Sequence, residues 1–271
     1  ASDVAVSNGG TLTAFTGSGT TYTFSVTPTA DGAVTVDIAA GGCMDIFSNT
    51  NTAATQFSII YDTTGPIATF SSTIDSITNV SPVPITITFN EPVIGFEVDD
   101  ITLFDGFNIA EGSFSDFSGS GTSYTVNFTP STDGWIRLII LEGLCTDDLG
   151  NSNTYSSMGV ATLTFDSTGP NPLITYWGFT GSPSNQDSIY ITVMWGIQSG
   201  NFESIAGLAG EHFTVTNATV KDYDSGSVSD EYIVCPIADG IVTFSIPDSV
   251  VTDYAGNYNF ASEVYSFISD R

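Results

Sequence analysis

The sequence predicts an all-β protein made of tandem antiparallel β-sandwiches arranged end to end. Three observations predict this fold class: a long internal repeat, short runs of alternating polar and apolar residues, and Asp-Gly turns between those runs. The segment DTTGP at 62–66 returns as DSTGP at 166–170, and Asp62, Asp166 and Asp270 follow one another at intervals of 104 residues (166 − 62 and 270 − 166). A fixed period of this size indicates an array of similar modules.

The content between these marks recurs as well. Residues 17–32 (GSGTTYTFSVTPTADG) match 119–134 (GSGTSYTVNFTPSTDG), and residues 41–49 (GGCMDIFSN) match 143–151 (GLCTDDLGN). A weaker third copy includes EYIVCPIADG at 231–240. The third module is therefore expected to be the most divergent.

We expect three domains from this repeat. Residues 1–65 are the C-terminal part of a module whose first strands are missing, 66–169 form a complete module, and 170–271 form a divergent one. The first is incomplete because Ser2-Asp3-Val4 aligns with Asp99-Asp100-Ile101. Two explanations are open: the chain is a piece of a longer array, or another chain supplies the missing strands.

Strand signals dominate each module. Along SYTVNF, the side chains of Tyr124, Val126 and Phe128 share one face, the pattern of a strand with one buried side. No segment keeps a helical apolar period beyond two turns. About seven strands per module is the count of an immunoglobulin-like sandwich, although the Cys-Trp-Cys signature of antibody domains is missing. The clearest strands and turns are ITITF (85–89), SYTVNFTP (123–130), WIRLIIL (135–141), ATLTF (161–165), Asp31-Gly32, Asp133-Gly134 and Asp239-Gly240.

Composition limits the classes of partner. The 271 residues are 41% hydrophobic, which favours folded modules, and 30 acidic against 3 basic residues give a net charge of −27. Nucleic acid is excluded as a partner, because phosphate binding needs Lys and Arg. Docking to anionic lipid is disfavoured, and no apolar stretch approaches the roughly 20 residues of a membrane span. Divalent cations are the expected counterions.

Little in the chain predicts catalysis, and we expect no enzyme. His212 is the single histidine, and no G-x-S-x-G motif is present. Three cysteines are too few for a disulfide framework. Cys43 and Cys145 share a repeat position, so we expect both to fill a small buried site after a strand; a thiol used between chains is the alternative.

Four segments carry a resemblance to a known family. They resemble the bacterial Ig-like repeats of large surface adhesins and biofilm-associated proteins, closely in the first two modules and weakly in the third. The resemblance implies extracellular stalk modules, often rigidified by calcium at their junctions, and does not indicate what is bound. The segments are TFNEPVIGFEVDDITLFDG (88–106), SGSGTSYTVNFTPSTDG (118–134), CTDDLGNSNT (145–154) and YDTTGP (61–66).

Acidic positions at the first junction predict a calcium site independently. In an up-and-down sandwich, the loop after the second strand, the last loop and the incoming linker lie at one end. This brings together four or five oxygen ligands, which suit Ca²⁺, whereas Zn²⁺ prefers His and Cys. The alternative is that D-x-x-G-N is only an Asx-rich turn. The expected ligands are Asp62, Glu91, Asp99 or Asp100, Asp147 and Asn151.

At the second junction, Asp166, Asp253 and Asn257 recur. The counterpart of Glu91 is lost, because the chain reads VMWGIQ at 193–198. We therefore expect a weaker or empty site there.

The preferred function is a non-enzymatic extracellular structural protein: the stalk of a long cell-surface adhesin or fibre. One alternative is the repeating subunit of a polymeric surface filament, sheath or layer. Another is an accessory repeat region of a secreted polysaccharide-active enzyme. The expected partners are other repeats of the same protein, including a homo-polymer, with a cell-surface or glycan ligand left open.

Overall fold

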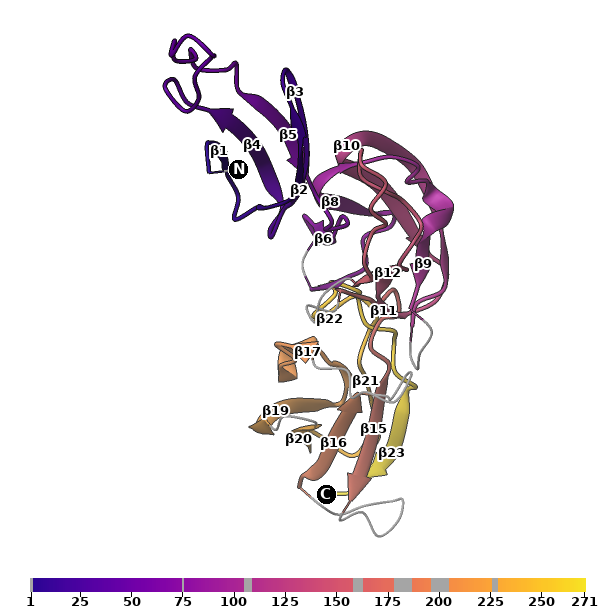
Figure 1. Ribbon diagram of the computed structural model, residues 1–271. Helices are drawn as coiled ribbons and strands as arrows, with labels where there is room; N and C mark the ends of the chain where they lie inside the picture. Colours follow the sequence, from indigo (N-terminus) through magenta and orange to yellow (C-terminus); the bar gives the residue numbers. More distant parts are fainter. Residues whose placement is uncertain are drawn as a thin grey trace.

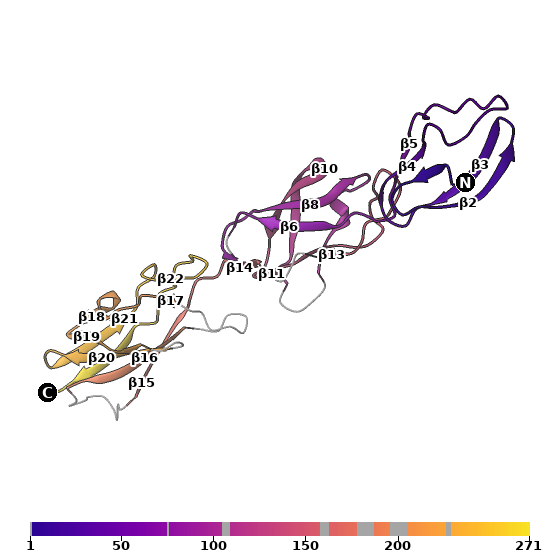
Figure 2. The same cartoon turned by 60° about the vertical axis from the view of Figure 1, so that its left-hand side comes forward.

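The computed structural model describes residues 2–74, 76–104, 109–157, 163–177, 187–195, 205–225 and 229–271. Its strands form three groups that follow one another in a row, with the two termini in the outer groups (Figures 1 and 2). The helical turns in these ranges are short 3-10 segments, η1 (Val98–Asp100) and η2 (Gly210–His212). Within the same ranges we find no helical segment with the length and hydropathy of a membrane span. The predicted all-β class is confirmed.

The central group, called module 2 below, has one hydrophobic core between its sheets (Figure 1). The sheet orders are β10–β8–β6, β11–β14–β7 and β13–β12–β9. The strands are β6 (Ala68–Ser72), β7 (Ile77–Thr78), β8 (Val83–Val93), β9 (Ile101–Leu103), β10 (Gly112–Pro130), β11 (Gly134–Ile136), β12 (Leu138–Ile140), β13 (Ser156–Ser157) and β14 (Leu163–Phe165).

Alternating side chains of β8 and β10 build this core. Tyr124 lies opposite Ile87 in the antiparallel ladder, and Phe128 lies opposite Val83. Tyr124, Val126 and Phe128 are all buried, as their shared face predicts. Because β8 alternates in the same way, the facing rows of the two strands pack into one cluster.

The strand order of module 2 differs from the expected up-and-down sandwich. β10 pairs with β8 although β9 lies between them in sequence, β12 pairs with β9, and β7 pairs with β14 in parallel. The chain therefore crosses between sheets, as immunoglobulin-like folds do. Within β10 the chain folds back at Gly119 and Gly121, where positive φ angles of 135° and 64° suit glycine.

The N-terminal group, module 1, has two small sheets, β1–β4–β5 and β2–β3. Among its large apolar side chains, Tyr22, Phe57 and Ile59 are exposed, and Val34 is the buried member of the described core. Cys43 is exposed, so the prediction of a buried site is confirmed for Cys145 and wrong for Cys43. The strands are β1 (Val4–Val6), β2 (Thr11–Ser18), β3 (Thr21–Thr27), β4 (Gly32–Ile38) and β5 (Phe57–Tyr61).

The C-terminal group, module 3, has a second core that shares no residue with the first. Its largest sheet has the order β15–β16–β20–β19. The strands are β15 (Pro172–Trp177), β16 (Ile189–Trp195), β17 (Ile205–Ala206), β18 (Thr214–Thr216), β19 (Ala218–Ser225), β20 (Ser229–Pro236), β21 (Gly240–Ser245), β22 (Thr252–Asp253) and β23 (Tyr265–Ser269).

Candidate metal centre at the first junction

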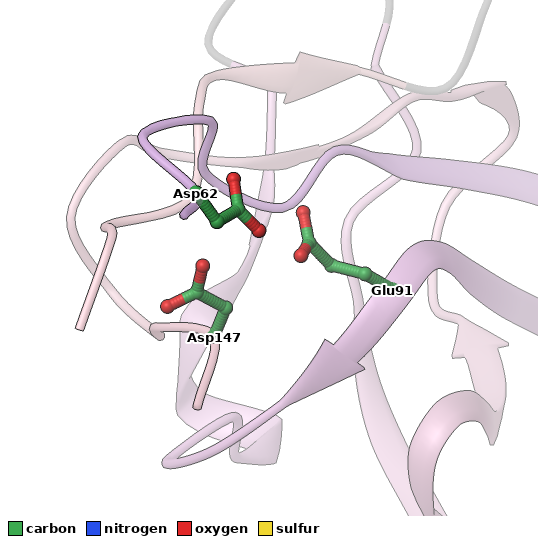
Figure 3. A group of neighbouring side chains, drawn as sticks. All are labelled: Asp62, Glu91 and Asp147. Carbon is green, nitrogen blue, oxygen red and sulfur yellow. The ribbon is translucent and has the colours of Figure 1, made fainter. Parts of the chain in front are cut away.

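Three carboxylates from separate segments meet where module 1 joins module 2. Asp62 follows β5 in the linker, Glu91 lies near the end of β8, and Asp147 lies in the loop between β12 and β13. One oxygen from each lies within 4.8 Å of the others. Figure 3 shows the three side chains converging from different parts of the chain. They line an open cleft together with Ile60, Pro92, Asp148 and Leu149.

The loop of Asp147 holds its carboxylate in a fixed orientation. Asp147 Oδ1 accepts hydrogen bonds from the backbone N–H groups of Leu149 and Asn151, both at 2.8 Å. Asp147 Oδ2 accepts a bond of 2.7 Å from Asn151 Nδ2. The D-x-x-G-N sequence is thus an Asx-type turn, as the alternative interpretation predicted, and the same turn directs Asp147 towards the two other carboxylates.

Ionisation of the cluster reflects this geometry. Burial, with the negative charges of Asp62 and Asp147 adding to it, raises the pKa of Glu91. Burial also acts to raise the pKa of Asp147, but hydrogen bonds from Asn151 and Leu149 outweigh it, and this pKa lies below its usual value. Two neighbouring carboxylates thus repel Glu91, and the described contacts contain no basic side chain that relieves the repulsion.

The chain's few basic side chains are engaged elsewhere or lie apart. Arg271 forms an ion pair of 3.1 Å with Asp187, which is the ion pair found among the described residues. Arg137 lies 4.2 Å from the centroid of the Phe104 ring. Oxygen ligands without nitrogen or sulfur fit a hard divalent cation such as Ca²⁺, so the residues present fit the predicted metal.

Three of the residues predicted for this site do not join the carboxylate group. Asp99 and Asp100 belong to η1, where Asp100 Oδ2 accepts a bond of 2.8 Å from the backbone N–H of Glu97. Asn151 is adjacent, but its Nδ2 donates to the main-chain oxygen of Asp62 at 3.1 Å. Asn151 therefore connects the linker to the Asp147 loop instead of presenting an oxygen.

The second junction repeats the hydrogen bonds but not the third carboxylate. Asn257 Nδ2 donates to Asp253 Oδ2 at 3.0 Å and to the Asp166 main-chain oxygen at 2.9 Å. Burial, followed by the charge of Asp253, raises the pKa of Asp166. Trp195 occupies the position of Glu91, since Ile191 lies opposite Tyr232 as Ile87 lies opposite Tyr124. Among the described residues, a group of three potential ligands occurs at the first junction alone.

The sequence interpretation missed a role for the Asp-Gly turns at the junctions. Asp31 Oδ1 accepts hydrogen bonds from the backbone N–H of Thr63 at 2.9 Å and from its hydroxyl at 3.0 Å. Asp133 Oδ1 accepts the equivalent bonds from Ser167, both at 2.8 Å. The joint recurrence of Asp-Gly and of Asp-Ser/Thr-Thr at matching repeat positions was the available signal.

Comparison with known proteins agrees with the fold. A family model described as a bacterial Ig-like domain matches residues 1–61 and 62–163. Among solved structures, the adhesin InvE of Yersinia pseudotuberculosis is similar over 76% of this chain and 59% of its own, with 12% identity and a TM-score of 0.27. This chain thus spans less than two thirds of that protein, and a TM-score this low carries no argument. None of the curated proteins compared matches the chain.

Proposed function

The chain belongs to the bacterial Ig-like domain family, and from this premise we propose that it is a non-catalytic spacer, a stalk segment of an extracellular surface protein. The acidic, lysine-poor composition suits a location outside the cell. A spacer has to hold its modules in a defined direction. The proposal therefore depends on how the modules are joined.

The observation that carries the proposal is that both linkers are bound on each side by repeated contacts. The preceding module holds the linker through Asp31 or Asp133, as described above. The following module donates from Thr154 N to Pro66 O at 3.0 Å, and from Phe260 N to Pro170 O at 2.9 Å. Linkers of this length with both ends bonded have little freedom to bend.

We assign Ca²⁺ to the first junction as part of this proposal. Asp62, Glu91 and Asp147 would hold the ion, and each belongs to a different segment: linker, β8 and the loop before β13. A bound cation would neutralise the repulsion around Glu91 and tie the linker to module 2. The second junction, which has Trp195 in place of a glutamate, would depend on hydrogen bonds alone.

Small-angle X-ray scattering tests the spacer function. The wild-type chain in calcium should give an elongated particle, with modules of about 40 Å each arranged in a row. The double variant Asp31→Ala, Asp133→Ala removes linker contacts from both junctions and should broaden the distribution of end-to-end distances. Ser2→Ala, which changes an exposed side chain away from both junctions, is the control. A compact wild-type particle would contradict the proposal.

A polymer subunit is the second candidate, and one observation favours it: the apolar residues of module 1 that lie exposed. Filaments viewed by negative stain would distinguish the two functions. Regular lateral lattices would support the polymer, whereas separate threads would support the spacer.

A further inference from the structure

One edge of module 1 lacks the partner that its repeat counterpart has. In module 2, residues Ser123–Phe128 of β10 pair with Val83–Thr88 of β8. The matching strand of module 1 is β3, and it pairs with β2. Among the described strands β3 has no second partner, so its outer edge presents unpaired N–H and C=O groups.

The side chains beside this edge are exposed where their counterparts are buried. Tyr22 is 52% exposed, against 6% for Tyr124 at the same repeat position. On the facing sheet, Ile59 is 56% exposed, against 4% for Leu163. The result is an open apolar groove between the two sheets of module 1, lined by Phe24, Val26, Val34, Val36, Phe57 and Ile59.

Module 2 shows what fills such a groove. Ile85, Ile87 and Phe89 of β8 enter the equivalent space, together with Ala68 of β6, and all four are buried. β6 and β8 pair with each other in register, Ala68 opposite Phe89, so they form one two-stranded insert. Both apolar filling and backbone pairing therefore come from a single segment, residues 68–93.

We propose that module 1 is a strand-acceptor site, whose occupant is a two-stranded segment of the β6–β8 pattern donated by a separate polypeptide. Its second strand pairs antiparallel with β3, placing an apolar residue opposite Tyr22 as Ile87 lies opposite Tyr124. Alternate residues of the donor fill the groove, and the residues between them face solvent. This inference is independent of the calcium site.

A donated segment fits better than a second copy lying face to face. Each whole chain has a net charge of −27, so two module 1 faces would approach against strong repulsion. The segment 64–98, in contrast, contains only the acidic residues Asp75, Glu91 and Glu97. A flat contact between copies would also leave the ladder positions of β3 without the slot-filling strand that module 2 has.

Cys43 provides a direct readout of occupancy. Its counterpart Cys145 is 3% exposed and belongs to the cluster of Val93 and Phe96, where burial raises its pKa to about 11. Ile94, just beyond β8, exchanges backbone hydrogen bonds of 2.7 and 3.1 Å with Thr146, the neighbour of Cys145. A donor that reaches this position would cover the Cys43 loop, which is exposed in the chain alone.

The test uses the full chain, a synthetic peptide of residues 64–98 and a thiol-alkylating reagent, with each cysteine followed by mass spectrometry. The labelling rate of Cys43 should fall at least tenfold on saturation with peptide, in a 1:1 complex by native mass, while Cys145 stays unreactive throughout. The same peptide with Ile85→Thr and Ile87→Thr should not protect. Val26→Asp in the acceptor should abolish protection, and Ser25→Asp, on the solvent face of β3, should not.

A second variant keeps the test decisive if the peptide precipitates. In it, residues 64–98 are fused ahead of the chain through a flexible linker, which should protect Cys43 without added peptide. Protection by the fusion but not by soluble peptide would overturn donation by a separate polypeptide. Protection in the peptide-free monomer, protection only in a dimer of the chain, or no protection in either format would each overturn the acceptor site.

Discussion

Glu91 has opposite expected effects with and without a cation, because its neighbours are negative. Its pKa is raised by burial and then by the charges of Asp62 and Asp147. A group with a raised folded-state pKa contributes stability below its unfolded pKa, and this contribution is lost as pH rises through the folded value. In chelator, Glu91 should therefore favour the folded state in acid, near and below its ordinary pKa of about 4.3, and disfavour it at neutral pH.

The variant Glu91→Gln should show this reversal. At neutral pH in chelator it should melt at a higher temperature than wild type, because one repelling charge is removed. In calcium it should melt lower than wild type, because a ligand is lost. At a hundredfold excess over Kd, calcium adds about 2.7 kcal/mol to the wild-type folded state. Thermal melts in both buffers measure the effect.

A matched change at the second junction is the control for that prediction. Asp253→Asn alters the equivalent loop, where Trp195 stands in place of the glutamate. Its melting temperature should differ from that of wild type by the same amount in calcium and in chelator. Wild-type melts that coincide in the two buffers would remove calcium from the first junction.

Single residues also show how far the sequence could predict the site. Asp62, Glu91 and Asp147 are brought together as expected, because the ends of β5 and β8 and the last loop meet at one end of module 2. Asp100 was misplaced because a carboxylate near a helical turn can instead accept a bond from its own backbone. The donor role of Asn151 depends on which way its amide points, which no sequence pattern specifies.

The linker is the element on which stiffness depends, and its glycine is tightly packed. A Cβ on Gly65 would lie 1.7 Å from Ser152 O, and a Cβ on Gly169 would lie 2.0 Å from Tyr258 O. Both neighbours are backbone atoms, so they cannot move aside as a flexible side chain would. Glycine is therefore required at these positions for close approach, and not for a positive φ angle.

Gly65→Ala should force the linker away from the loop of module 2. Crowding of this kind costs about 1–3 kcal/mol. We expect faster proteolytic cleavage between Tyr61 and Ile67, with the melting of module 3 unchanged. Thr64→Ser, which keeps a hydroxyl at the neighbouring position, is the control. Cleavage at the wild-type rate would show that this contact does not hold the junction.

The Asp-Gly turns show what local sequence signals omit. Asp-Gly predicts a hairpin because both residues tolerate turn conformations, and β4 indeed begins at Gly32. The hydrogen bonds of Asp31 with Thr63 span 32 positions, and such a contact follows from the crossing of the chain between modules. The up-and-down order failed for a related reason: alternation reveals which face is buried, and not which strand lies beside it.

At the scale of the whole molecule, the modules have separate cores and should unfold separately. The cluster of module 2 and the cluster of module 3 have no residue in common. Ile87→Ala, at a fully buried position of β8, should destabilise module 2 by about 2–5 kcal/mol. Calorimetry should show that transition moving to lower temperature while the transition of module 3 stays in place. Ile191→Ala, its counterpart on β16, should give the reverse result.

Calcium should change the shape of the whole chain at one junction and not at the other. The ion would bind Asp62 of the linker together with Glu91 and Asp147 of module 2, so it restricts bending between modules 1 and 2. Spin labels placed on exposed positions of neighbouring modules measure each angle separately: Thr20 with Ser120 across the first junction, and Ser120 with Asp248 across the second. Chelator should broaden the first distance distribution and leave the second unchanged, because the hydrogen bonds of Asp133 and Asn257 do not require a cation. Equal broadening of both distributions would show that calcium acts through general screening of the acidic surface. Broadening of neither would show that hydrogen bonds alone stiffen the stalk.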